Sequence, residues 1–177
     1  LRVIALDKTG TITEGKPRLV ATEVLSPSDP EAKVLSWAAS LAGHSDHPVS
    51  KAIAKGLNLP ENGLTDFTAL PGRGIEARLD GHNLILGNHR LIEDRGLCSP
   101  EIEARLAVHE NQGRTATLLA TEGRVLAIFA VADTIKESSR EAITDLHRLG
   151  VTSVMLTGDN VATAVSIARQ AGIDDAR

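Results

Sequence analysis

Two apolar segments, each followed by a short polar stretch, constrain the fold of this chain more than any other feature. Residues 1–6 lead into DKTGTIT at 7–13, and residues 151–156 lead into TGDN at 157–160. Apolar runs of this length predict buried strands. In a parallel α/β sheet, such strands deliver their last side chains to the carboxyl edge, where these folds place their chemistry. We therefore expect the two polar stretches to lie beside each other.

The first polar stretch combines the groups that phosphoryl transfer to a carboxylate requires. Asp7 supplies a carboxylate, Lys8 supplies a cation, and threonines at 9, 11 and 13 supply hydroxyl groups. Gly10 permits a positive φ and lets the backbone approach a ligand closely. Carboxylate nucleophiles and cations arranged around the phosphate are the usual parts of such a site. For the Asp-x-Thr pattern alone, an acidic residue that only caps a loop is the alternative.

The complete stretch DKTGTIT resembles the phosphorylation motif of P-type ATPases, and TGDN resembles their second phosphate-site motif. The resemblance implies that Asp7 attacks the γ-phosphate of ATP and becomes an aspartyl phosphate, while Lys8 helps to neutralise the phosphate. It also implies that the Asp7 carboxylate and the Thr9 carbonyl bind Mg²⁺, and that Thr11 contacts the phosphoryl oxygens. Three further residues of the implied phosphate site come from the second motif: Thr157, Gly158 and Asp159.

Position 9 separates this pattern from phosphatases of the related haloacid-dehalogenase superfamily. Those enzymes usually carry a second Asp there, as a general acid and base, whereas Thr9 cannot do that work at neutral pH. We therefore expect an acyl phosphate that is not hydrolysed at once. A phosphatase with a cap domain and a nucleotide-binding module without catalysis are the two alternatives of other classes.

Between the two motifs, further residues resemble the nucleotide-binding motifs of heavy-metal P-type ATPases. His47 precedes Pro48 at the start of an apolar helical face, and the resemblance implies that its imidazole stacks on adenine or hydrogen-bonds to it. Such stacking contributes about 1–3 kcal/mol; a polar helix cap is the alternative. The other implied contacts form a glycine-rich set: Gly72, Arg73, Gly74, Gly87 and Asn88. Ala42 replaces a Glu of the family, so we expect weaker or less selective adenine binding, or a contact from another group.

The return from the inserted region is marked by Asp133 and Lys136. We expect Asp133 to cap a helix, because short acidic side chains accept hydrogen bonds from the first turn. In the family, this Asp-x-x-basic element lines the hinge between domains. The resemblance implies that Asp133 lies at that hinge and that Lys136 reaches towards the nucleotide.

These patterns predict an α/β fold in two parts. A Rossmann-like phosphorylation domain of the haloacid-dehalogenase type is expected at 1–16 and 132–177, interrupted at 17–131 by an α+β nucleotide-binding domain with an antiparallel sheet. Asp80-Gly81 predicts a type I′ hairpin within the insert. The chain begins in mid-strand without Met and lacks the later GDGxND motif of the family. We therefore expect a piece of a longer protein, with an incomplete phosphorylation domain that autophosphorylates poorly.

Composition excludes several classes of partner. A net charge of −4 and 2% aromatic residues argue against nucleic acid, and no apolar run approaches the ~20 residues of a membrane span. Cys98 is the single cysteine, so we expect neither a disulfide framework nor a zinc site built on paired cysteines.

The resemblance implies that the partners are ATP and the transmembrane and actuator domains of the same protein, at the cytoplasmic side of the cell membrane. General similarity, including residues 96–100, favours export of Zn²⁺, Cd²⁺ or Pb²⁺ over Cu⁺.

Overall fold

The computed structural model describes residues 2–176, and Leu1 and Arg177 lie outside the described part. The chain divides into two compact units. Unit 1 holds the residues up to Pro17, the segment Ala107–Thr115 and the residues from Ala132 onward, and unit 2 holds Arg18–Leu106 and Ala116–Val131. Segment 107–115 therefore groups with the termini, whereas the sequence patterns place it in the insert. Which unit binds nucleotide and which is phosphorylated stays a prediction.

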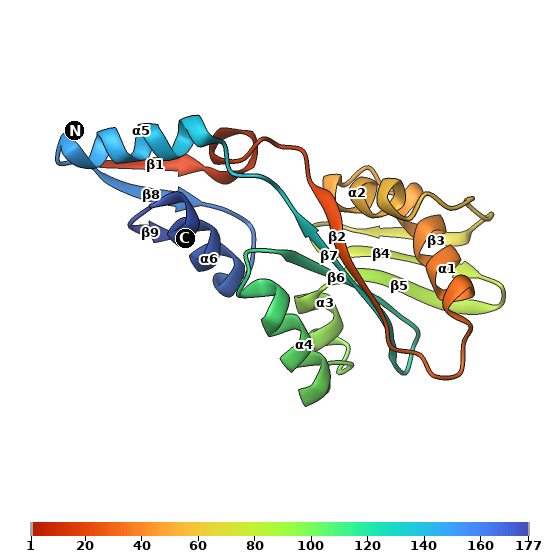
Figure 1. Ribbon diagram of the computed structural model, residues 1–177. Coiled ribbons are helices and arrows are strands. Elements are labelled where there is room, and N and C mark those ends of the chain that lie inside the picture. Colours follow the sequence, from red (N-terminus) through yellow and green to blue (C-terminus); the bar gives the residue numbers. More distant parts are fainter. Residues whose placement is uncertain (1, 177) are drawn as a thin grey trace. The chain divides into compact units, whose positions relative to one another are not determined.

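Unit 1 contains a parallel sheet in the order β1-β8-β9. Its strands are β1 (Val3–Asp7), β8 (Thr152–Leu156) and β9 (Asp175–Ala176), and its long helices are α5 (Glu137–Arg148) and α6 (Val161–Ala171) (Figure 1). Both helices contribute side chains to the core cluster that also receives Leu6 and Met155. The opposite face of the strands is open, with Val3 55% and Leu156 45% exposed. The two strands are therefore half-buried, not fully buried as their sequences predict.

Unit 2 is built on a six-stranded sheet in the order β2-β7-β6-β5-β4-β3. The strands are β2 (Arg18–Val24), β3 (Thr65–Leu70), β4 (Gly74–Leu79), β5 (His82–Asn88), β6 (Thr115–Ala120) and β7 (Val125–Ala132). The pairs β3–β4, β4–β5 and β5–β6 are antiparallel. Asp80 and Gly81 join β4 to β5 with φ values of 52° and 79°, as a type I′ turn requires.

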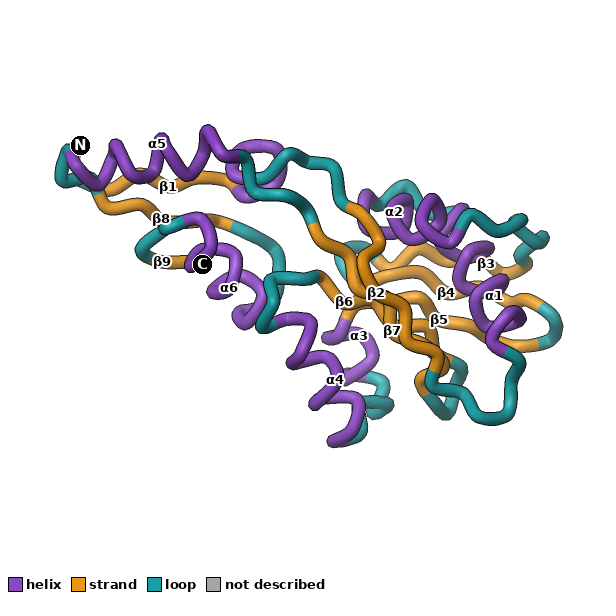
Figure 2. Tube along the Cα trace, in the orientation of Figure 1, coloured by secondary structure: helices purple, strands orange, loops and turns teal. Residues whose placement is uncertain are grey.

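Helices cover both faces of this sheet. Helices α1 (Glu31–Gly43) and α2 (Pro48–Leu57) pack on one face, and α3 (His89–Asp94) and α4 (Pro100–Glu110) pack on the other (Figure 2). Consecutive side chains of a strand point to opposite faces, and in β5 Leu84 and Leu86 join the first cluster while Ile85 joins the second. Burial on both sides explains why β6 and β7 are apolar along their whole length. Trp37 lies in the first cluster, 1% exposed.

The Asp side chains that precede α5 and α1 do not cap these helices, although the sequence predicts such a cap at Asp133. Asp133 does not cap α5, because Lys136 is the residue that precedes the first turn of that helix. At the start of α1, Pro30 occupies the cap position, and the carboxylate of Asp29 instead accepts hydrogen bonds from Ser26 and Arg124. At both positions the Asp carboxylate accepts hydrogen bonds from other groups instead of from the first-turn N–H groups of the helix. Among residues 2–176, no helix is long and apolar enough to cross a membrane.

Candidate functional site

Asp7 is the last residue of β1 and lies opposite Leu156 in the parallel register of β1 and β8. Its side chain is exposed, and the next residue after Leu156 is Thr157. The two motifs therefore meet at the carboxyl edge of the sheet in unit 1, as expected for parallel strands. Gly10 has a φ of 77° and no heavy atom within 4 Å of a Cβ built on it. A glycine is needed there for backbone conformation, not for lack of space.

The backbone of the motif loop is held by side chains from two directions. The hydroxyl of Thr13 is buried and donates to the Lys8 carbonyl at 3.2 Å. The ammonium group of Lys136 donates to the Gly10 carbonyl, and the Ser139 hydroxyl donates to the carbonyl of residue 11 at 3.0 Å. Lys136 is thus a support of the loop in this structure. The side chains at 9 and 11 remain exposed.

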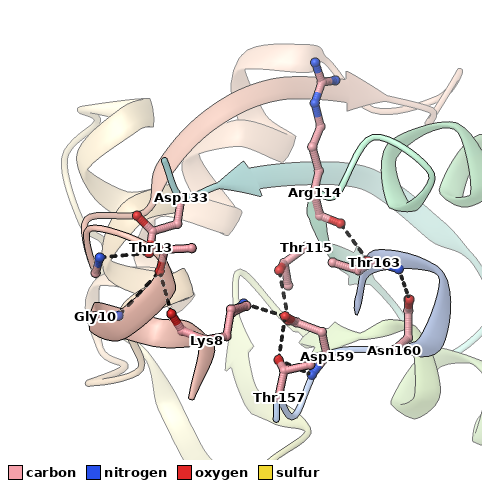
Figure 3. A network of polar contacts seen from close by, with 11 residues as sticks. Lys8, Gly10, Thr13, Arg114, Thr115, Asp133, Thr157, Asp159, Asn160 and Thr163 are labelled. Carbon is pink, nitrogen blue, oxygen red and sulfur yellow. Dashed lines mark hydrogen bonds and ion pairs between the residues drawn. The ribbon is translucent and has the colours of Figure 1, made fainter. Parts of the chain in front are cut away.

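Lys8 and Asp159 form an ion pair at the centre of the site (Figure 3). Their side chains are only 14% and 11% exposed. The Asp159 carboxylate also accepts hydrogen bonds from the Thr157 hydroxyl at 2.8 Å and from the Thr115 hydroxyl at 3.2 Å. The pair therefore holds the cation of the first motif beside the hydroxyl of the second. Thr115 was not predicted from the sequence, because its place at the start of β6 carries no local motif.

The remaining predicted residues of unit 1 have defined positions. Gly158 is exposed, and nothing lies within 4 Å of a Cβ built on it. Asn160 caps α6 by accepting a hydrogen bond from the Thr163 N–H at 2.9 Å. The Asp133 carboxylate accepts from the backbone N–H groups of Gly15 and Lys16 at 3.0 and 3.1 Å. Asp133 therefore ties the segment that leaves unit 1 to the segment that returns.

Mg²⁺ binds oxygen ligands from carboxylates, carbonyls and water, and the donors at this edge are of that type. The exposed Asp7 carboxylate stands at the strand tip, and no thiol or imidazole lies among the motif residues at 7–13 or 157–160. The predicted pair, the Asp7 carboxylate and the carbonyl of Thr9, therefore fits Mg²⁺ in chemical type.

The predicted glycines of unit 2 are brought together where β4 pairs with β5. Gly74 lies opposite Gly87 in the register, and it has a φ of 152°. A Cβ on Gly74 would lie 2.3 Å from the carbonyl oxygen of Leu86, and a Cβ on Gly87 would lie 2.5 Å from Leu91 Cδ2. Gly74 is therefore required by the backbone packing of unit 2, whereas a side chain at Gly87 would displace the flexible end of Leu91.

Asn88 links this strand pair to the neighbouring turn and helix. Its side-chain oxygen caps α3 by accepting from the Leu91 N–H at 2.9 Å, and its side-chain amide donates to the Gly72 carbonyl at 3.0 Å. Arg73 forms an ion pair with Asp94 at 2.6 Å. The structure thus brings Gly72, Arg73 and Asn88 together. A Cβ built on Gly72 would have no heavy atom within 4 Å.

His47 lies at the start of α2, with its side chain exposed. Its Nδ1 accepts a hydrogen bond from the Val49 N–H at 3.3 Å, so it does act as a helix cap. Ala42 is fully buried in α1 and has no polar side-chain atom that could bind a ligand. Glu61 was not singled out from the sequence; its carboxylate lies against Gly43, the residue after Ala42 in α1, and 3.7 Å from His44 Nδ1.

Comparisons with known proteins agree with the resemblance read from the sequence. A copper-exporting P-type ATPase of Staphylococcus saprophyticus subsp. saprophyticus is 42% identical over 174 residues, which are 97% of this chain and 21% of that protein. A copper-exporting P-type ATPase of Staphylococcus aureus is 41% identical over 175 residues. The crystal structure of a zinc-transporting PIB-type ATPase in an E2.Pi state matches 99% of this chain and 28% of its own, with a TM-score of 0.68 and 32% identity.

The chain spans about a fifth of the length of these curated relatives. The fold prediction and the resemblance to heavy-metal P-type ATPases are both confirmed, and relatives of copper-exporting and zinc-transporting kinds are both present. The family model for haloacid dehalogenase-like hydrolases matches residues 1–177. The chain therefore belongs to the haloacid dehalogenase-like hydrolase family.

Proposed function

We propose that this chain is the ATP-binding and aspartyl-phosphorylation region of a membrane ATPase that exports heavy-metal cations. The observation that carries the proposal is the exposed carboxylate of Asp7 at the tip of β1, beside the Lys8–Asp159 pair and the start of the second motif. Its partners would be the transmembrane and actuator domains of the same protein, on the cytoplasmic side of the membrane. The exported ion is proposed only as a class, Zn²⁺, Cd²⁺, Pb²⁺ or Cu⁺.

In the proposed reaction, a carboxylate oxygen of Asp7 forms a bond to the γ-phosphorus of ATP. The bond from that phosphorus to the β–γ bridging oxygen breaks, and its electron pair leaves with ADP. Each pair of unit charges brought to ~4 Å costs on the order of 4 kcal/mol at an effective dielectric of 20, so cations must offset the repulsion. Bound Mg²⁺ would supply part of that charge, and the Lys8 ammonium supplies another part.

The residues around Asp7 would have complementary roles. The exposed turn at Gly158 and the Thr157 hydroxyl would hydrogen-bond the phosphoryl oxygens, because they precede the N-terminus of α6. Thr9 offers no acid or base for removing the phosphate from Asp7. The acyl phosphate would therefore persist until another part of the protein acts on it.

Nucleotide binding is proposed for the exposed His47 ring and for the turn at Gly72–Gly74 with Gly87 and Asn88. We further propose that Glu61 accepts a hydrogen bond from the adenine amino group, because Ala42 is buried and the Glu61 carboxylate lies against Gly43, the next residue of α1. In unit 1, Asp133 would hold the two segments of the hinge together. Lys136 would contribute indirectly, by holding the motif loop through the Gly10 carbonyl.

The test is to incubate the full-length protein in membranes with Mg²⁺ and γ-labelled ATP, together with this chain alone. We expect an acid-stable, hydroxylamine-sensitive label on Asp7 that Asp7→Asn abolishes. Steady release of phosphate without any adduct would favour the phosphatase alternative. Binding of ATP with neither adduct nor phosphate release in the full-length protein would favour a module without catalysis.

A further inference from the structure

Three metal-binding residue types come together on the α3–α4 side of unit 2. His89 is the first residue of α3, Cys98 lies between α3 and α4, and Glu103 lies in the first turn of α4. One ligand atom of each lies within 4.8 Å of the other two. The His89 Nε2 is 3.0 Å from a carboxylate oxygen of Glu103.

The fold holds these three residues at fixed positions. Helices α3 and α4 both enter the second core cluster of unit 2, and Cys98 packs against that cluster. The connection between the helices is also tied down, because the Leu97 N–H donates to the Ile92 carbonyl at 3.1 Å and the Ile102 N–H donates to the Ser99 hydroxyl at 3.3 Å. The backbone that carries the three side chains is therefore held in place by packing and hydrogen bonding, which favours a preorganised metal site.

The donor set is one imidazole nitrogen, one sulfur and one carboxylate oxygen. Mg²⁺ and Ca²⁺ prefer oxygen alone, whereas Zn²⁺ accepts all three donors, at about 2.0–2.3 Å. Those bond lengths set the ligand atoms of a tetrahedral site ~3.3–3.8 Å apart. The 3.0 Å contact between His89 and Glu103 must therefore widen slightly, while any ligand pair near the 4.8 Å limit must contract. A thiolate and a carboxylate also balance the charge of a divalent cation.

We propose that His89, Cys98 and Glu103 form a binding site for a thiophilic divalent cation of the Zn²⁺ class. The cation takes the place of the contact between His89 and Glu103, the Cys98 thiol gives its proton to solvent, and water fills the fourth position. All three side chains are partly exposed, so the ion has a route to the site. This site is separate from the proposed aspartyl phosphorylation and does not depend on it.

The experiment is a Co²⁺ titration of the reduced full chain, followed by displacement with Zn²⁺. Co²⁺ held by Cys98 has a thiolate-to-metal absorption band that Co²⁺ on oxygen ligands lacks, which separates this site from Asp7. We expect one ion per chain. Cys98→Ser should abolish the band, and Cys98→Ser, His89→Gln and Glu103→Gln should each weaken Zn²⁺ binding at least about tenfold, since loss of supporting partners alone costs that much.

The matched control is His44→Gln. His44 also lies beside a carboxylate, 3.7 Å from Glu61, but no thiol completes that pair, so this variant should bind Zn²⁺ as the wild type does. Circular dichroism of each variant shows that it is folded. Co²⁺ binding without the thiolate band, unchanged Zn²⁺ affinity in Cys98→Ser, or one ion shared by two chains through their cysteines would each overturn the proposal.

Discussion

At the scale of single residues, the site depends on one ion pair of low exposure. Lys8 comes from the first motif and Asp159 from the second, 151 positions apart in the sequence. Removing one member of such a pair leaves the other charge without compensation, whereas exposed ion pairs contribute little. Asp159 is therefore a structural element of unit 1 as well as part of the proposed phosphate site.

We expect Asp159→Asn to destabilise unit 1 by about 1–3 kcal/mol, the usual cost of losing a charged hydrogen-bond partner. The matched control is Asp145→Asn, whose exposed pair with Arg148 has side chains 68% and 75% exposed and which should change stability very little. Urea unfolding monitored by circular dichroism measures both. Equal midpoints for the two variants would show that the Lys8–Asp159 pair does not stabilise the fold.

Gly10→Ala tests the backbone at the motif loop. An L-residue held at the left-handed φ of 77° costs about 1–2 kcal/mol, and no steric term is added because the Cβ has open space. Gly158→Ala is the matched control, since that position also has open space but no positive φ. The same urea assay should show destabilisation for Gly10→Ala only; an equal loss in both variants would contradict this account.

His47 has two separable properties, its cap on α2 and its aromatic ring. We expect the chain to bind ATP with a Kd of about 0.1–1 mM, and His47→Ala to weaken binding by about 1 kcal/mol or more. His47→Asn keeps a good helix cap but removes the ring. Weaker binding in a calorimetric titration of His47→Asn, with unchanged thermal stability, supports an adenine contact; wild-type affinity removes His47 from the site.

At the scale of elements, Asp174 joins the end of α5 to β8. Hydrogen bonds from the Ser153 backbone N–H at 2.8 Å, then from the Ser153 hydroxyl, and the charge of His147 hold the pKa of Asp174 below its usual value. A carboxyl group whose pKa is lower in the folded state stabilises the fold above its unfolded pKa. That contribution disappears as the pH falls through the folded value.

We therefore expect Asp174→Asn to lower the urea midpoint at neutral pH. The difference from wild type should shrink as the pH falls below about 4, near the unfolded pKa of an Asp, because protonation then removes the same charge in the wild type. Urea titrations at several acidic pH values measure this trend. A difference that stays constant down to acid pH would assign the effect to packing and not to the charge.

At the scale of the whole molecule, the two units have separate cores. The cluster around Ile143 and Met155 shares no residue with the two clusters of unit 2. Trp37 is the single tryptophan of the chain and lies in unit 2, so its fluorescence reports on that unit alone. Circular dichroism reports on helices of both units.

Met155→Ala tests whether the units unfold independently. Met155 is fully buried in unit 1, and its truncation should cost about 2–5 kcal/mol. We expect part of the circular dichroism transition to move to lower urea while the Trp37 fluorescence transition stays in place. A parallel shift of both signals would show that the two units unfold as one cooperative system.

The sequence by itself determined the parts that depend on short-range patterns. The strands ending at Asp7 and near Thr157 follow from hydrophobic patterning, and the turn at Asp80-Gly81 follows from the positive φ values that Asp and Gly tolerate. These properties involve residues within a few positions of each other. They can be read without knowing what lies opposite in space.

The tertiary structure alone decided which side chains meet across long separations. Thr115 reaches Asp159 over 44 positions, and the Asp133 carboxylate accepts from Gly15 over 118 positions instead of capping a helix. The neighbours His89, Cys98 and Glu103 share no familiar motif spacing, and only the packing of α3 and α4 brings their ligand atoms together. Such contacts depend on how whole elements pack, because a hydrogen bond selects its partner by distance and direction in space and not by position along the chain.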